Sequence, residues 1–411
     1  MLQNVTLTPS RRTLEFGIYR DGDNNLDAVQ EAVVGQALQT SAKDSRIAFT
    51  VEDTTALPQG HSARADRLHT DEFTISDGKI RDEQTGKPHD MSDEGNLAQF
   101  VAHTLDRAQA DGVKQTWIDL VDHGGGDGGG LQTADGSCMS MPDIAKAISD
   151  GVALHAKEHP EDAGRNVDGV VANQCLMDTM GFADALSHAG VKWLAASPET
   201  MLAPGAPSDV AHAIAANEGD PHAMARAVVA DVMKAKYDAG DFGGFGPAAA
   251  FDVLDLDSAK LAKAESAIKR FNDAAVAASR SGGARQAIRQ DVGAIDGMAR
   301  FPGATSDMPW RADRPAMAVY DTIASDGRLG DALRGDAAAA REAVGKLVLA
   351  HRESANFDAF GGADYSDAAG PTIHAPVRRS QVDPWARDGV SETDNAFYRA
   401  VDQNAFARAI A

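Results

Sequence analysis

Residues 167–182, "VDGVVANQCLMDTMGF", join an apolar run to a polar end and then to a helical pattern. The run 167–172 is typical of a buried strand, and Leu176, Met180, Ala183 and Leu186 recur at helical spacing over 176–189. Cys175, one of only two cysteines in 411 residues, lies at the junction. The stretch therefore predicts a strand that leads directly into a helix, with a thiol at the helix N-terminus.

The same alternation of strand and helix recurs through the first 200 residues. Further apolar or β-branched runs lie at 14–19, 46–52, 116–121 and 191–196, and helical patterns lie at 25–40, 93–110 and 141–157. Strands that alternate with helices require crossover connections, which favour parallel neighbours. The sequence therefore predicts an α/β fold with a mostly parallel sheet flanked by helices.

Two segments depart from this alternation. Residues 67–86 alternate in polarity and contain glycine, which predicts a hairpin inserted between the second and third sheet strands. After about residue 205, Ala-rich helical stretches dominate, at 222–238, 258–280, 284–299 and 336–356. We therefore divide the chain into a sheet domain, residues 1–205, and a helix-rich C-terminal region, residues 206–411, packed on it.

Composition excludes several classes of function. The formal charge of −22 argues against nucleic acid and anionic membranes as partners, because both bind surfaces rich in Lys and Arg. The chain contains no run of 18 apolar residues, so no membrane-spanning helix is expected. The N-terminus lacks the pattern of a secretory signal. Two cysteines cannot form a disulfide framework. A cytoplasmic protein is the expectation.

A second strand end carries unusual sequence, "QTWIDLVDHGGGDGGG" at 115–130. The carboxyl ends of neighbouring parallel strands meet at one edge of a sheet, so His123 and Cys175 are expected to face the same cleft. A helix N-terminus favours a thiolate, and an imidazole can carry the proton that acyl transfer by a thiol requires. The glycines after His123 let backbone N–H groups approach a substrate carbonyl. Together these features predict a thiol hydrolase.

Structural alternatives fit the same residues. A buried cysteine, a hydrogen-bonded core histidine and a flexible glycine loop would each suit a protein without this activity. Phosphate binding fits less well, because the loop lacks the Lys-Ser/Thr ending of a P-loop and the spacing of a dinucleotide site.

Several segments in order along the chain resemble those of the clostripain family of cysteine peptidases. They are "YRDGDNNLD" (19–27), "MSDEGNLAQFV" (91–101), "DLVDHGGG" (119–126), "NQCLMDTMGFADAL" (173–186), "AASPET" (195–200), "AAAFDVLDLDSAKL" (248–261) and "AGPTIHAP" (369–376). The family belongs to the caspase-like clan, with gingipain and legumain as more distant relatives. The resemblance implies a caspase-like fold, His123 as catalytic histidine, Cys175 as nucleophile, and the N–H groups of Gly124 and Cys175 as oxyanion hole. It implies a polypeptide substrate and no required cofactor.

The chain departs from the family pattern around the expected substrate pocket. Family members carry Asp two residues before the cysteine, which helps select Arg or Lys at P1, but this chain has Asn173. A neutral amide cannot offset a cationic side chain, so a preference for Arg or Lys should weaken. Pro198 also replaces a usual acidic residue. The candidate substrate-binding residues are Asn24, Asn25, Asn173, Ser197 and Glu199.

Calcium is a further possibility, since the carboxylates of "DGDNNLD" make Asp21 and Asp23 candidate ligands. The EF-hand spacing fails here, because Leu26 takes the place of its glycine and Ala32 that of its bidentate Glu. Capping of a helix that begins near Leu26 explains the same residues.

Cys138 and Arg165 also lie at positions of interest. Cys138 precedes a helix that Pro142 starts and has no basic partner in its motif, which favours a structural role. Arg165 lies in a polar loop between the histidine and cysteine strands, where self-cleavage of a zymogen would fall.

Three functions stay open from the sequence. The leading one is a cysteine endopeptidase that hydrolyses peptide bonds through an acyl-enzyme on Cys175, with His123 as acid and base. The second is a caspase-like binding or regulatory module with weak or no turnover, which Asn173 and Pro198 motivate. The third is transfer of the acyl group to an amine, which would use the same acyl-enzyme.

Overall fold

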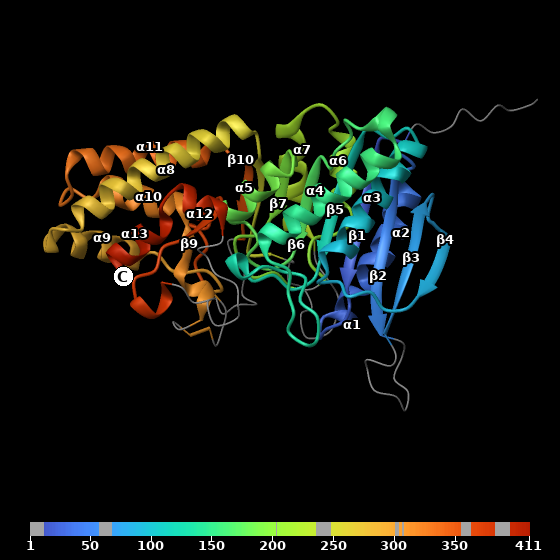
Figure 1. The fold of residues 1–411 in the computed structure, drawn as a ribbon, viewed down its shortest axis with the longest axis horizontal. Coiled ribbons are helices and arrows are strands. Elements are labelled where there is room, and N and C mark those ends of the chain that lie inside the picture. The colour runs from blue at the N-terminus through green and yellow to red at the C-terminus, as the bar shows by residue number, and fades with distance from the viewer. Residues whose placement is uncertain are drawn as a thin grey trace, which may run out of the picture.

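The computed structural model describes residues 12–56, 68–202, 204–235, 248–300, 304–305, 308–354, 363–382 and 395–411. Its centre is a nine-stranded sheet in the order β10-β8-β7-β6-β5-β1-β2-β3-β4 (Figure 1). The strands are β1 (Leu14–Asp21), β2 (Ile47–Ala56), β3 (Leu68–Ser76), β4 (Lys79–Gly86), β5 (Gln115–Val121), β6 (Gly169–Asn173), β7 (Trp193–Ala196), β8 (Ala250–Asp255) and β10 (Val348–Glu353).

The five central strands run parallel, in the order β7-β6-β5-β1-β2. The strands at both edges are antiparallel: β8 and β10 on one side, β3 and β4 on the other. The hairpin expected at 67–86 corresponds to β3 and β4, and it extends the sheet beyond β2. The predicted α/β class with a mostly parallel sheet is confirmed.

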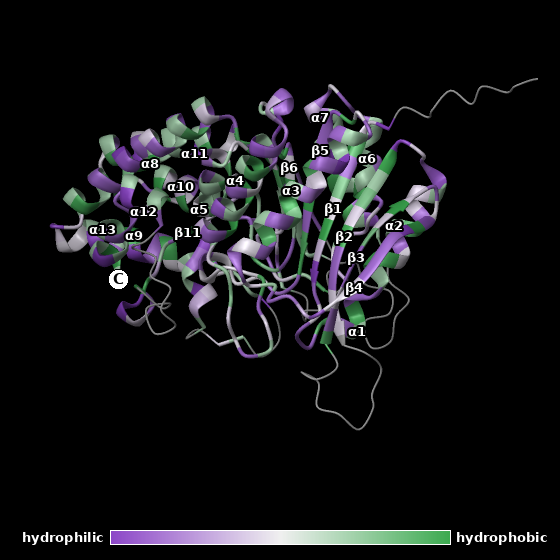
Figure 2. Ribbon diagram, turned by 45° about the vertical axis from the view of Figure 1, so that its right-hand side comes forward, coloured by the Kyte–Doolittle hydropathy of each residue, from purple (hydrophilic) through white to green (hydrophobic). Residues whose placement is uncertain are grey.

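Helices cover both faces of the sheet because side chains of the buried strands alternate between two cores. On β5, Ile118 and Leu120 face one core, whereas Trp117 and Val121 face the other. The first core packs against α3 (Glu94–Ala110), α4 (Met141–Glu158) and α5 (Met180–His188). The second packs against α2 (Ala32–Lys43), α6 (Val210–Ala216) and α7 (Pro221–Lys234). Figure 2 shows apolar residues concentrated along the central strands, while β4 is exposed throughout.

A helical lobe extends the first core beyond the sheet (Figure 1). It contains α8 (Ser258–Ala278), α9 (Gly282–Ala294), α10 (Ala316–Ser325), α11 (Asp331–Gly345) and α13 (Gln403–Ile410). The remaining elements are α1 (Asp27–Gln30), α12 (Ala396–Ala400) and the antiparallel pair β9 (Asp313–Pro315) and β11 (Thr372–His374). Within the described ranges, no helix has both the length and the apolarity to span a bilayer.

The structure differs from the sequence expectation in the C-terminal half. Residues 336–356 do not form one helix: α11 ends at Gly345, and residues 348–353 form β10, paired with β8. Strands β8 and β10 both follow residue 205, so the boundary expected there does not separate the sheet from the C-terminal region. The apolar residues of β8 are buried and those of β10 are partly buried, and this tertiary packing overrides the helical composition around them.

Candidate active site

The site lies where β5 and β6 end side by side. The two strands are parallel neighbours in register, with Val121 opposite Asn173. His123 and Cys175 follow these strand ends, and both line one cavity of about 730 Å³. As predicted, His123 and Cys175 lie at the same ends of neighbouring strands and face one cavity.

The segment after Cys175 is not the helix that the sequence suggested. Helix α5 begins only at Met180, and the Thr179 side chain caps it by accepting a hydrogen bond from the Phe182 N–H. Between Cys175 and α5 the chain turns sharply, with Leu176 at φ 66°, a conformation that few residues other than glycine adopt. The thiol therefore does not lie at a helix N-terminus, and the helix dipole does not stabilise a thiolate there.

The environment of the Cys175 thiol favours its protonated form. Burial raises the pKa of Cys175 to about 11, and the negative charges of Glu199 and Asp122 act in the same direction. The Met201 N–H donates to Sγ at 3.3 Å, which lowers the pKa but does not offset burial. Cys175 is accordingly a protonated thiol at neutral pH.

Two consecutive asparagines hold the segment that carries the histidine. Asn25 Oδ1 lies 2.8 Å from His123 Nε2, and Asn24 Nδ2 donates to Asp122 Oδ1 at 2.5 Å. Asp122 also accepts a hydrogen bond from the Gln132 N–H across the glycine loop. Burial lowers the pKa of His123, so its imidazole is neutral at neutral pH. With Nε2–H donating to Asn25, Nδ1 is the nitrogen able to accept a proton.

The glycine loop packs directly against the backbone of the cysteine. A Cβ on Gly124 would lie 2.3 Å from the Cys175 carbonyl oxygen and 3.0 Å from its nitrogen, so only glycine fits there. In the described part of the chain, neither the Gly124 nor the Cys175 N–H donates a hydrogen bond to a protein acceptor. Both N–H groups are thus available to a developing oxyanion, which is the role that the resemblance implied.

Gln174 is a site residue that the sequence analysis missed. Its side-chain Nε2 donates to the His123 carbonyl oxygen at 2.9 Å, and the side chain is buried. A Cβ on Gly130 would lie 2.5 Å from the same nitrogen, so the glycine loop closes over this amide. Gln174 therefore fixes the strand end that carries His123 relative to the strand end that carries Cys175. It lies beside Cys175 within the quoted segment 173–186, but its role depends on a contact with His123, 51 positions away, that the motif does not reveal.

Three of the predicted substrate-binding residues are buried and bonded within the protein. Asn173 exchanges hydrogen bonds with the Ala206 backbone, through Nδ2 at 3.2 Å and through Oδ1 at 2.7 Å. The Ser197 hydroxyl donates to the carbonyl oxygens of Glu199 and Ala250. The Glu199 carboxylate lies 3.3 Å from the Arg300 guanidinium, and both side chains are buried. None of the three lines the cavity.

The remaining candidates also have defined positions. Asp21 is buried and accepts a hydrogen bond from the Asp23 N–H, and burial raises its pKa to about 7. Neither aspartate belongs to the His, Cys, Asp and Glu clusters that are tight enough for a metal ion within the described ranges. The calcium role stays a prediction. Cys138, expected to be structural, is exposed and lines the same cavity as Cys175.

The fold and the cleft at its strand ends define the class of the protein: a caspase-like α/β fold of the kind found in the C11, or clostripain, cysteine proteases. No protein-family model and no curated protein matches the chain. The likeness comes from solved structures, whose identity to this chain is low, so it establishes the shared architecture.

Three of these structures match almost end to end. A secreted C11 cysteine protease from Bacteroides thetaiotaomicron, iotapain, has a TM-score of 0.62 at 13% identity, over 95% of this chain and 99% of that one. A C11 protease from the same organism in complex with an irreversible peptide inhibitor has a TM-score of 0.63 at 14% identity, over 95% and 99%. An inactive zymogen C11 protease from Parabacteroides distasonis has a TM-score of 0.61 at 14% identity, over 96% and 99%.

Proposed function

We propose that the protein is a cysteine endopeptidase with Cys175 as nucleophile and His123 as acid and base. The observation that carries the proposal is the shared cavity, which brings together the thiol, the neutral imidazole and the N–H groups of Gly124 and Cys175. The likeness in fold to C11 cysteine proteases supports the same class of reaction.

The order of proton transfers follows from the two protonation states. As Sγ attacks the peptide carbonyl carbon, the thiol proton passes to His123 Nδ1 and a C–S bond forms. The oxyanion accepts hydrogen bonds from the Gly124 and Cys175 N–H groups. The imidazolium then protonates the leaving amine as the C–N bond breaks. Water, deprotonated by the neutral imidazole, hydrolyses the thioester, releases the carboxylic acid product and returns the thiol.

The side chain accepted at P1 depends on the charge of the cavity wall. The described lining residues include Gln132, Thr200, Ala299 and Trp310, and none of those described carries a carboxylate. Glu199, an acidic candidate from the sequence, is already paired with Arg300. We therefore propose that the pocket for the P1 residue accepts uncharged side chains, and that the preference of the clostripain family for Arg or Lys is weak here.

Covalent labelling tests the proposal. A set of peptide acyloxymethyl ketones that differ only at P1 should label the native protein, and Cys175→Ala should abolish labelling. Cys138→Ala is the matched control, since Cys138 lines the same cavity and its loss should leave labelling intact. A fluorogenic library diverse at P1, read with and without calcium, would then rank the substrates. Labelling that survives Cys175→Ala but disappears in Cys138→Ala would contradict the assignment.

Self-cleavage is a separate question, raised by the zymogen among the structural neighbours. Arg165, the expected cleavage position, forms an ion pair with Asp162 and donates to the Val113 carbonyl oxygen at 2.7 Å. These contacts hold its side chain against the protein, so we propose that the loop stays uncut. The intact mass of the purified native protein should equal that of Cys175→Ala apart from the substitution. Two fragments in the native protein alone would contradict this.

A further inference from the structure

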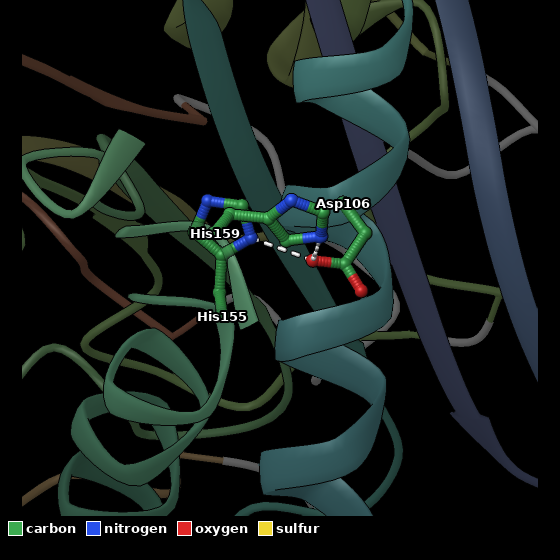
Figure 3. Close-up of side chains that lie close together, drawn as sticks. All are labelled: Asp106, His155 and His159. Carbon is green, nitrogen blue, oxygen red and sulfur yellow. Dashed lines mark hydrogen bonds and ion pairs between the residues drawn. The ribbon is translucent and has the colours of Figure 1, made fainter. Parts of the chain in front are cut away.

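A cluster of one aspartate and two histidines lies away from the candidate active site (Figure 3). His155, in the last turn of α4, and His159, the residue that caps it, are four positions apart, and Asp106 lies on the facing helix α3. One ligand atom from each of the three residues lies within 4.8 Å of the others. Figure 3 shows both imidazole rings directed at the same oxygen of Asp106.

The distances suit a small cation. His155 Nδ1 lies 2.6 Å and His159 Nε2 lies 3.3 Å from Asp106 Oδ1. Ligand atoms around a tetrahedral Zn²⁺ with bonds of ~2.0–2.1 Å lie ~3.3 Å apart. One separation already has this value, and the other would reach it by a small rotation of the Asp106 carboxylate, which is about one third exposed.

The outward nitrogens of both rings face carboxylates. His155 Nε2 lies 3.5 Å from Asp162 Oδ2, and His159 Nδ1 lies 3.4 Å from Glu161 Oε1. Histidines that bind a metal commonly donate their other N–H to a carboxylate, which fixes the tautomer and the ring orientation. These carboxylates are themselves held in place, Asp162 by Arg165 and Glu161 by a 2.7 Å hydrogen bond from Gln109.

Burial distinguishes this cluster from a chance group of surface side chains. The His155 side chain is fully buried, with Asp162 as the carboxylate facing its Nε2. The ring of His155 stacks on that of His159, with centroids 5.0 Å apart. A buried imidazole oriented by its neighbours loses little freedom on binding an ion.

We propose that Asp106, His155 and His159 form a binding site for a divalent transition-metal ion of the Zn²⁺ type. His155 Nδ1, His159 Nε2 and one Asp106 oxygen are the protein ligands, and water completes the tetrahedron. The ion ties α3 to the end of α4 and orders the turn at 160–162. Its role is structural, because the site lies at the far end of α4 from the catalytic cavity.

Cobalt binding tests the site. The full-length protein with Cys138→Ser and Cys175→Ala, which removes both competing thiols, is titrated with Co²⁺ and followed by visible absorption. One equivalent should bind, and saturating Zn²⁺ should displace it and raise the Tm by ~2 °C or more. His159→Gln and Asp106→Asn, added singly, should each weaken binding ~100-fold, and Asp162→Asn ~10-fold.

The matched control is His212→Gln in the same background. His212 is half exposed and pairs with a single carboxylate, that of Asp44, at 2.8 Å, so its loss should leave binding unchanged. Circular dichroism confirms that each variant is folded. The proposal is overturned if no saturable binding occurs below ~100 μM, if His159→Gln and Asp106→Asn bind as tightly as the parent, or if His212→Gln weakens binding as much as they do.

Discussion

Histidines with different partners lie near the two ends of α4. Near its first residue lies the glycine loop, where His123 faces the neutral amide of Asn25. Near its last residue, His155 and His159 face the carboxylate of Asp106. An 18-residue helix separates the two places by ~27 Å.

In the proposed functions, the same side chain serves two tasks. A catalytic imidazole must gain and lose a proton within one turnover, so an amide partner that orients the ring without fixing its charge is suitable. A carboxylate partner instead suits a bound metal ion, as proposed for His155 and His159.

Removal of His123 should have the largest effect on peptidase activity. His123→Ala removes the only group in the proposed mechanism that moves protons, so kcat/KM should fall ~10²- to 10⁴-fold. Because the imidazole is partly exposed, the Tm should change little. Turnover of a fluorogenic peptide and a thermal melt on the same preparation measure both. A variant that keeps more than a tenth of native kcat/KM would exclude His123 as the acid and base.

A second prediction concerns stability and the amino-terminal ends of the parallel strands. Glu15, near the start of β1, is buried and accepts a hydrogen bond from the Thr50 hydroxyl at 2.7 Å, and burial raises its pKa to about 7. A folded-state pKa above the ordinary 4.5 means that its protonated form stabilises the fold below pH 4.5. This stabilisation is lost as the pH rises through about 7.

Glu15→Gln should therefore increase stability at pH 8 by ~3 kcal/mol and leave stability near pH 4 almost unchanged. Denaturant unfolding at both pH values measures the difference from the native chain. Glu83→Gln, on the exposed strand β4, is the matched control and should change neither value. Equal effects of Glu15→Gln at both pH values would mean that the Glu15 carboxyl titrates normally in the fold.

The parts of this fold that the sequence predicted are those with strong local patterns. Five apolar runs became the five parallel strands, and the adjacency of two of them placed His123 and Cys175 at one edge. The start of α5 was misplaced because apolar spacing continues through Leu176, whereas the helix begins only after the Thr179 cap. Strand β10 was missed because an Ala-rich helix precedes it and its partner β8 lies ~100 residues away in the chain.

The partners of the site residues were beyond the reach of sequence patterns. The motif at 19–27 singled out Asn24 and Asn25, but only the pairing of β1 with β5 brings them to Asp122 and His123. Gln174 acts through a contact 51 positions away. A helical spacing can place two histidines on one helix face, but the helix that supplies their carboxylate is set by tertiary packing.

A smaller effect is expected from Gln174, which connects the strand ends that carry His123 and Cys175. Gln174→Ala should lower kcat/KM ~10- to 100-fold, because His123 loses the donor that holds its backbone. Gln174→Glu keeps the length but cannot donate, so it should be as slow as the alanine variant. Gln84→Ala, on exposed β4, serves as control. Native activity in Gln174→Glu would show that the hydrogen bond to the His123 carbonyl is dispensable.

The smallest effect, and the most direct test of the comparison, is Asn25→Asp. This change gives His123 the carboxylate partner that the histidines at the other end of α4 possess, so its pKa should rise by about one unit. Since the neutral imidazole accepts the thiol proton, the acid limb of kcat/KM against pH should move up by the same amount. Above the limb the variant should stay within a few-fold of native, because the ring keeps its hydrogen bond. Asn25→Ser, which shortens the side chain but adds no charge, should leave the limb in place, and an unmoved limb in Asn25→Asp would show that His123 does not titrate in the step that limits the rate.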